Sequence, residues 1–184
     1  MSKDVLRSQL LTLRDELSPA HREAFNQRIS EYLIEMLPMR PLRIGSYMAY
    51  GSEVNLDIFH RQVFGGANEL LIPRILSKTT MEMVIYQQDA DLIIGRFGIR
   101  TSKQRKVTEL SALDWLIMPC CGFDRRGHRL GMGGGFYDRA LDLCPPSSPI
   151  RIGVAYGAQE TQFEPEHWDQ SLDWIITEDG FIRQ

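Results

Sequence analysis

The chain has 184 residues, of which 43% are hydrophobic and 24% charged, a composition that suits one soluble domain with a substantial core. Its net charge of −3 provides no broad positive field, so a nucleic-acid partner is not indicated. No apolar run has the length of a membrane span or of a signal peptide's core, and we therefore expect no membrane partner and a cytoplasmic protein with residues 1–184 in a single domain. The sequence leaves the oligomeric state open, and a monomer is compatible with it.

The first part of the chain predicts two helices. Leucines that recur at three- and four-residue steps share one face of the first helix, and these are Leu6, Leu10, Leu13 and Leu17. The same periodicity places three cations elsewhere on the helix, namely Lys3, Arg7 and Arg14. Ser18 followed by Pro19 is typical of an N-cap and a first helical position, so a second helix is predicted to begin here and to end before Pro38.

Beyond Pro41 the pattern changes to short apolar runs bounded by proline and glycine, which are typical of strands. These runs predict strands at 43–50, 69–76, 81–87, 113–123, 149–156 and 172–182. Between the first two runs, Asn55 is expected to cap a helix that continues through Phe64. Strands separated by helical stretches predict an α/β, single-domain layered fold with a largely parallel central sheet flanked by helices. Ligands of such folds normally bind beyond the carboxyl ends of the strands.

One glycine-rich segment stands out, the run RLGMGGGFYDR from Arg129 to Arg139. It follows a predicted strand and precedes a predicted helix start, where free backbone N–H groups favour an anion. Glycine lets a phosphate approach the main chain, and Asp138 offers a hard oxygen ligand for magnesium. The alternative is a flexible surface turn with incidental charges, because the spacing matches neither the dinucleotide pattern nor the Walker pattern.

The longer run GFDRRGHRLGMGGGFYDR closely resembles the signature of the 5-formyltetrahydrofolate cyclo-ligases, also called 5,10-methenyltetrahydrofolate synthetases. The resemblance extends to the Lys3-x-x-x-Arg7 start, to an acidic SEV segment after the first predicted strand, and to the late run WDQSLDWIITEDG. It implies an enzyme that converts 5-formyltetrahydrofolate and ATP to 5,10-methenyltetrahydrofolate, ADP and phosphate, with magnesium. In the reaction implied, the γ-phosphoryl group of ATP moves to the formyl oxygen, and N10 then attacks the formyl carbon.

The same resemblance implies a nucleotide site along the glycine loop. ATP would contact Arg129, Leu130, Gly131, Met132, Gly133, Gly134, Gly135, Phe136 and Tyr137. Lys3 and Arg7 would reach the nucleotide from the first helix, although a solvated charged face is their alternative. Arg129 and Asp138 would be the catalytic residues, and Asp138 and Asp169 the magnesium ligands. Neighbouring carboxylates compete with Asp169 for that role, and they are Glu164, Glu166 and Asp173.

The resemblance also implies a folate site next to the nucleotide. Glu53 would face the pterin, whose amino group and ring N–H present paired donors, and Met48 would supply an apolar contact. The substrate would share part of the glycine loop with ATP, namely Met132, Gly133, Gly134, Gly135 and Phe136. The alternatives are a surface carboxylate for Glu53, a core position for Met48, and packing roles for Phe136 and Tyr137.

Some positions differ from the family's usual pattern. Phe136 precedes Tyr137 where many relatives have two tyrosines, and Gly134 stands where some have a lysine. The segment 96–102 lacks the family's acidic-proline pair, so its role is open, and the sequence does not assign the three tryptophans to core or ligand. Two other functions remain possible from the residues: a folate- or nucleotide-binding protein without catalysis, and a sugar-phosphate isomerase of similar architecture.

Overall fold

An eight-stranded sheet forms the centre of the computed structural model, which describes residues 2–87 and 92–184. In spatial order its strands are β12 (Gly180–Arg183), β11 (Trp174–Thr177), β10 (Ile150–Val154), β7 (Trp115–Pro119), β1 (Arg43–Gly45), β2 (Glu69–Ile75), β3 (Met81–Tyr86) and β6 (Val107–Thr108). The five central strands, from β11 to β2, pair in parallel, whereas β12, β3 and β6 pair antiparallel at the two edges. The largely parallel central sheet predicted from the sequence is therefore confirmed.

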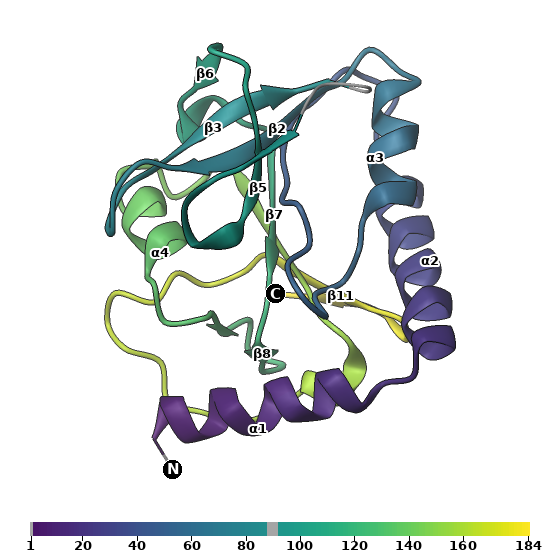
Figure 1. Ribbon diagram of the computed structural model, residues 1–184, viewed down its shortest axis with the longest axis vertical. Coiled ribbons are helices and arrows are strands. Elements are labelled where there is room, and N and C mark those ends of the chain that lie inside the picture. The colour runs from purple at the N-terminus through teal and green to yellow at the C-terminus, as the bar shows by residue number, and fades with distance from the viewer. Residues whose placement is uncertain (1, 88–91) are drawn as a thin grey trace.

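In the part of the chain that the structure describes, four α-helices surround this sheet, and they are α1 (Lys3–Glu16), α2 (Pro19–Glu35), α3 (Asp57–Phe64) and α4 (Phe136–Leu141). Helices α2 and α3 cover one face of the sheet and α4 lies on the other side, while α1 runs across the end at which β7 leads into β8 (Figure 1). A core cluster lies on each side of the sheet, with Ile29 and Phe59 buried on the side of α2 and α3 and Leu141 buried on the side of α4. Within the described residues, no helix combines the length and apolarity needed to cross a bilayer.

Smaller elements lie beside the main sheet. Two separate hairpins pair β4 (Leu92–Ile94) with β5 (Arg100–Ser102) and β8 (Gly122–Phe123) with β9 (Arg129–Leu130). Short 3-10 helices occur at η1 (Arg96–Gly98), η2 (Leu110–Ala112) and η3 (Gly157–Gln159). The β8–β9 hairpin follows the carboxyl end of β7 and leads directly into the glycine loop, so the loop starts at the sheet edge where ligands of parallel sheets bind.

The start of α2 was predictable from local chemistry. The Ser18 side chain accepts a hydrogen bond from the backbone N–H of His21 at 3.2 Å, and Pro19 is the first residue of the helix, as predicted. The predicted cap of α3 is wrong, because Leu56 is the N-cap residue. The Asn55 side chain instead accepts from the N–H of Asp57 at 2.7 Å, which closes a turn just before the helix.

The predicted inward face of α1 is partly wrong. Leu10 is buried as expected, but Leu13 is 46% exposed and Arg14 is only 5% exposed. The inward face instead contains Leu10 together with Arg7 and Arg14, which are three and four residues away from it and therefore lie on the same side. Leucine periodicity alone misses this face because the helix lies over a cavity with charged residues in its wall as well as over the core.

The predicted strand 113–123 is wrong as a single element, because it divides into β7 in the main sheet and β8 in a separate hairpin. Two other strand predictions need correction. The run 43–50 forms strand only at Arg43–Gly45, and after Ser46 donates its N–H to the carbonyl of Leu71 at 2.8 Å the chain leaves the sheet. The run 172–182 is two antiparallel strands, β11 and β12, because the chain reverses before Gly180, whose φ is 129°. Hydrophobic content correctly indicated a strand in each of these two segments, but it did not show at which residue the pairing with the neighbouring strand ends.

Candidate active site

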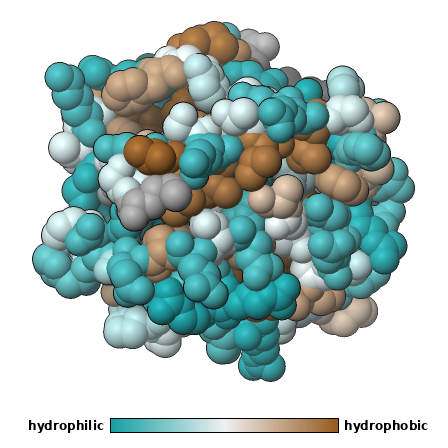
Figure 2. Space-filling view, turned by 90° about the horizontal axis from the view of Figure 1, so that it is seen from below, coloured by the Kyte–Doolittle hydropathy of each residue, from teal (hydrophilic) through white to brown (hydrophobic). Residues whose placement is uncertain are grey.

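A cavity of about 1100 Å³ lies between α1, the segment after β1, the β2–β3 hairpin, the η1 turn, the glycine loop and the segment 166–169. Every residue predicted for the site lines it, and these are Lys3, Arg7, Met48, Glu53, Arg129, Leu130, Gly131, Met132, Gly133, Gly134, Gly135, Phe136, Tyr137, Asp138 and Asp169. Seen from below, hydrophobic residues form a band across a largely hydrophilic surface (Figure 2). The structure thus brings together residues that lie up to 166 positions apart in the sequence.

Arginine side chains hold the glycine loop in place. Arg7 donates from Nε to the carbonyl of Gly131 at 2.8 Å, and Arg139 donates from Nη2 to the carbonyl of Gly134 at 2.6 Å. Arg139 also donates from Nε to the carbonyl of Thr79 at 3.0 Å, which joins the loop to the β2–β3 hairpin. The loop is therefore a braced element of the cavity wall, and the interpretation as a flexible surface turn does not fit it.

The absence of side chains in the loop makes room for these arginines. A Cβ atom at Gly131 would lie 2.9 Å from Nη1 of Arg129, and one at Gly135 would lie 2.6 Å from Nη1 of Arg139. Gly135 also has a φ of 62°, in the left-handed region that residues with a Cβ rarely adopt. The glycines therefore permit close approach of the protein's own cations to the main chain.

We expect Gly135→Ala to lower the free energy of unfolding by about 1–2 kcal/mol from backbone strain, with a further loss from displacement of Arg139. Gly51→Ala is the matched control, because Gly51 has a φ of 60° but nothing within 4 Å of its added Cβ. Urea unfolding of both variants separates strain from displacement. Equal losses in the two variants would contradict the expected contribution of Arg139.

Arg129 and Asp138 form a partly buried ion pair at the base of the loop. Nη2 of Arg129 lies 3.3 Å from each carboxylate oxygen of Asp138, and the Arg129 side chain is 6% exposed. The guanidinium also lies over the ring of Tyr137, at 5.3 Å from its centroid, and burial raises the pKa of that phenol well above its ordinary value. Oδ1 of Asp138 accepts a further hydrogen bond from the N–H of Gln170 at 3.3 Å. Two predicted catalytic residues are thus in direct contact.

Lys3 and Asp169 form the second ion pair of the cavity. Nζ of Lys3 lies 2.6 Å from Oδ2 of Asp169 and 3.9 Å from Oε1 of Glu166. The same Oδ2 accepts the N–H of Glu166 at 2.8 Å, which fixes the turn that carries the carboxylate. Lys3 is therefore directed into the cavity and connects α1 to the segment 166–169, so the alternative of a solvated surface charge does not fit it.

Glu53 lies in the loop after Gly51, with Oε2 accepting the N–H of Tyr50 at 3.0 Å. Burial raises the pKa of this carboxyl above its ordinary value, and the hydrogen bond from Tyr50 and the charge of Arg14 oppose that rise. Met48, at 5% exposure, packs against Ile72 while it also lines the cavity, so it belongs both to the core and to the cavity wall.

Several cavity residues were not identified from the sequence. Arg14 lines the cavity although its position on α1 gave no signal, and Phe97 lies 59% exposed at the rim with a φ of 57°. The rings of Phe97 and Phe136 are 6.2 Å apart between centroids. The segment 96–102, whose role the sequence left open, thus contributes an aromatic side chain to the cavity. Gly98, which follows Phe97 and has a φ of 76°, was the one sequence signal for a tight turn here.

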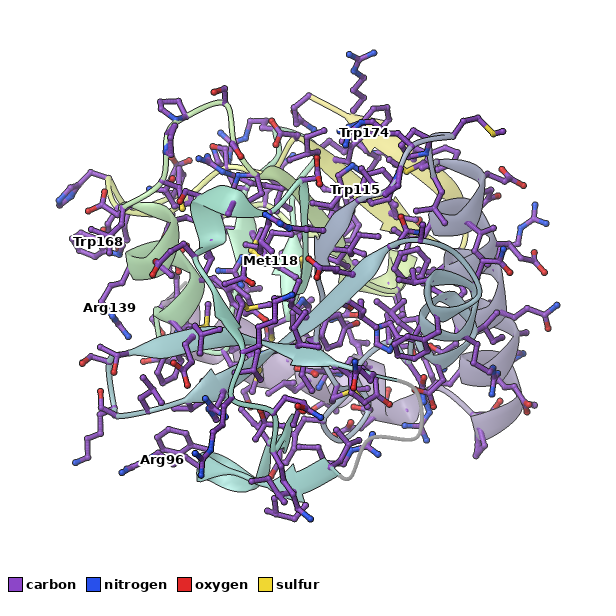
Figure 3. All side chains as sticks on the ribbon, turned by 90° about the horizontal axis from the view of Figure 1, so that it is seen from above. Arg96, Trp115, Met118, Arg139, Trp168 and Trp174 are labelled. Carbon is purple, nitrogen blue, oxygen red and sulfur yellow. The ribbon has the colours of Figure 1, made fainter. Side chains whose placement is uncertain are left out.

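The three tryptophans are now assigned. Trp115 in β7 is buried in the core, and Trp174 in β11 packs against the core with its side chain partly buried. Trp168, by contrast, is 56% exposed and lines the cavity. Figure 3 shows Trp168 and Arg139 projecting on the same side of the molecule, away from Trp115 and Trp174. An exposed aromatic ring beside a cluster of cations is suited to stack on a planar ligand.

Comparison with known proteins gives a consistent result over almost the whole chain. The sequence model of the 5-formyltetrahydrofolate cyclo-ligase family matches residues 1–178. A 5-formyltetrahydrofolate cyclo-ligase of Haemophilus influenzae is 28% identical over 177 residues, which cover 93% of this chain and 95% of that protein. The enzyme of the same description from Mycoplasma pneumoniae is 29% identical over 182 residues, which cover 97% of this chain and 100% of that protein.

Solved structures show the same architecture. A 5,10-methenyltetrahydrofolate synthetase from Mycoplasma pneumoniae matches with a TM-score of 0.82 and 27% identity, over 97% of this chain and 99% of that one. The corresponding protein from Aquifex aeolicus matches with a TM-score of 0.85 and 27% identity, over 100% of this chain and 93% of that one.

Proposed function

The chain belongs to the 5-formyltetrahydrofolate cyclo-ligase family and is an enzyme of that kind, and on this basis we propose that it converts 5-formyltetrahydrofolate to 5,10-methenyltetrahydrofolate with ATP and magnesium, releasing ADP and phosphate. The observation that most supports this proposal is the composition of the cavity. Cations from α1 and the glycine loop share it with Glu53, so one space offers groups suited to a polyphosphate and to a pterin.

The proposed chemistry first activates the formyl oxygen. Transfer of the γ-phosphoryl group of ATP onto that oxygen converts it into a leaving group, N10 attacks the formyl carbon, and the C–O bond breaks with release of phosphate. Phosphoryl transfer depends mainly on positioning and on neutralising the charge of the phosphoryl oxygens. Lys3, Arg7 and Arg129 are the side chains assigned to that role, because all three reach the cavity beside the glycine loop.

The chain's own contacts make these cations well ordered before a nucleotide arrives. Arg7 is held by Gly131, Arg129 by Asp138, and Lys3 by Asp169. A preorganised cation costs little reorganisation at the moment of reaction. Each of the three has donors besides those used in these contacts, so phosphate oxygens can be added as further acceptors.

Asp138 and Asp169 are the residues proposed to hold magnesium. Both line the cavity with partly exposed side chains, 18% and 17%, and carboxylate oxygens are the ligands that this ion prefers. The described residues contain no group of three or more potential metal ligands, which fits an ion held by one or two carboxylates plus phosphate oxygens and water. Magnesium bound there supplies charge neutralisation at the phosphates.

A direct assay tests the proposed function. Purified protein is mixed with 5-formyltetrahydrofolate, ATP and magnesium, and the methenyl product is followed by its near-ultraviolet absorbance. Parallel reactions lack ATP or contain a chelator. Product only in the complete mixture supports the proposal. Folate binding without product would point to a binding protein, and neither binding nor product would favour the isomerase alternative.

Replacement of Glu53 by glutamine is expected to weaken folate binding and to stabilise the free protein. The dissociation constant for 5-formyltetrahydrofolate rises about tenfold or more, because a neutral amide replaces the carboxylate that accepts the paired pterin donors. The free protein becomes more stable at neutral pH, because burial raises the folded-state pKa of Glu53 above 4.5 and ionisation of the buried group then costs stability.

The pH dependence identifies the origin of that stability difference. Below the unfolded pKa both side chains are neutral, so the advantage of Glu53→Gln disappears as the pH falls below about 4.5 and grows as the pH rises through the folded pKa. Thermal unfolding of both proteins between pH 4 and pH 8 measures this stability difference. A glutamine variant that binds folate as tightly as the natural protein would exclude Glu53 from the pterin site.

A further inference from the structure

Arg14 is a buried cation that forms no ion pair with a carboxylate in the described part of the chain. It is 5% exposed, and its only hydrogen bond to a side chain in the described residues runs from Nε to Oγ of Ser52 at 2.9 Å. Arg14 also lines the cavity, so its Nη1 and Nη2 groups remain as donors for a ligand.

The contacts of Arg14 place it near Glu53, the residue proposed to face the pterin. Ser52, which accepts from its Nε, directly precedes Glu53 and also donates to Oδ1 of Asp15. The charge of Arg14 is close enough to Glu53 to lower the pKa of that carboxyl, against the larger effect of burial. By contrast, the glycine loop is braced by Arg7 and Arg139, and Arg14 makes no hydrogen bond to it in the described residues.

The edge of a pterin presents three groups in a row, the 2-amino N–H, the N3–H and the 4-carbonyl oxygen. A carboxylate such as Glu53 can accept from the first two, but it repels the third, which is itself an acceptor. A complete match to that edge therefore needs a donor beside the carboxylate. A guanidinium has a planar set of donors and stays charged in a protein interior, so it is well suited to this position.

We propose that Arg14 is a specificity-determining residue that donates a hydrogen bond to the 4-carbonyl of the pterin, next to the contact of Glu53 with the two N–H groups. This inference rests on the proposed function, and it extends that function by naming which ring substituent the protein selects. Glu53 accepts from the two N–H groups of the pterin edge and Arg14 donates to its carbonyl, so the pair matches the donor–donor–acceptor order of that edge. Ser52 holds the guanidinium by its Nε, which leaves the two terminal nitrogens free for the ligand.

The test compares 5-formyltetrahydrofolate with the analogue whose 4-carbonyl is replaced by an amino group, an exchange that also removes the proton from N3. The contribution of Arg14 is therefore the change in the ratio of the two dissociation constants between the natural protein and the variant, because the altered contact of Glu53 is common to both proteins. The natural protein is expected to bind the carbonyl compound more tightly. The measured quantity is the dissociation constant of the amino analogue divided by that of 5-formyltetrahydrofolate. In Arg14→Met this ratio should fall by about tenfold or more, because the charged donor that favours the carbonyl is lost. The KM for ATP should stay within about threefold of the natural value.

Arg28→Met is the matched control, because Arg28 stacks on Tyr32 at 5.1 Å and does not line the cavity. It should leave the ratio unchanged. If Arg14→Met does not fold, Ser52→Ala is used as the test variant instead. Loss of the acceptor for Nε leaves the guanidinium less well held, so the ratio of the two dissociation constants should fall here as well.

Two results would overturn the proposal. An unchanged ratio with equally weakened binding of both ligands would make Arg14 a structural residue, and a selective rise in the KM for ATP would make it part of the nucleotide site. Failure of the proposed function is separate, because the natural protein would then form no methenyl product from 5-formyltetrahydrofolate and ATP, whatever the ratio of its dissociation constants for the two folate compounds.

Discussion

Asp138→Asn is expected to lower kcat by about 100-fold or more while the dissociation constant for 5-formyltetrahydrofolate changes little. Asparagine keeps the shape of aspartate and can still accept the N–H of Gln170, but it loses the charge that pairs with Arg129 and that would bind magnesium. Single-turnover kinetics together with folate titration separate the two effects. A higher magnesium concentration should restore part of the lost rate if the weakened step is metal binding.

Asp142→Asn is the matched control for this prediction. Asp142 lies one helical turn after Asp138, is exposed and also lines the cavity, but in the described residues it forms no ion pair with an arginine or lysine side chain. We expect its neutralisation to change kcat by less than about threefold. If both substitutions had the same effect, general loss of negative charge from the cavity would explain the result, and a specific role of Asp138 would be contradicted.

Arg129→Lys is expected to lower kcat by about 100- to 1000-fold although the positive charge is kept. The guanidinium contacts both oxygens of Asp138, lies over Tyr137 and fills the space left open at Gly131. Lysine is a compact ammonium on a flexible chain, so it cannot hold Asp138 and donate to a phosphate in one fixed plane. Steady-state kinetics with ATP as the varied substrate measure the loss.

Arg139→Lys provides the comparison on the same loop. Arg139 is exposed and donates to the carbonyls of Gly134 and Thr79, contacts that position the loop without placing charge at its base. We expect a loss smaller than about tenfold, mainly in KM for ATP. A loss as large as that of Arg129→Lys would show that bracing of the loop, and not the buried guanidinium, limits the reaction.

The parts of the site that the sequence predicts are those carried by local chemistry. A strand followed by glycines and a helix start places the loop at the carboxyl end of β7, because the order of elements determines which edge of a parallel sheet a segment reaches. The resemblance in the glycine run and at Lys3 and Arg7 then identified residues that line one cavity. These signals are contained within a few neighbouring positions, so a single sequence is enough to recognise them.

Arg14 shows why the rest was not predictable. Its burial depends on which side of α1 faces the cavity, and that is decided by the packing of the helix against segments far away in the sequence, such as the loop with Ser52. The end of β1 is hard to predict for a similar reason, because residues 47–50 are still hydrophobic and aromatic although they have left the sheet. Three of them, Tyr47, Met48 and Tyr50, line the cavity. Periodicity reports that a residue is suited to burial, but it does not distinguish a core from a cavity wall.

The contact between Lys3 and Asp169 has a consequence for how the protein is made. A chain emerging from the ribosome exposes its first helix long before residue 169 is synthesised, and until then the acidic partner of Lys3 does not exist. Substrates therefore have no complete binding place on a growing polypeptide, and they can act as folding aids only after nearly all of the chain has been translated.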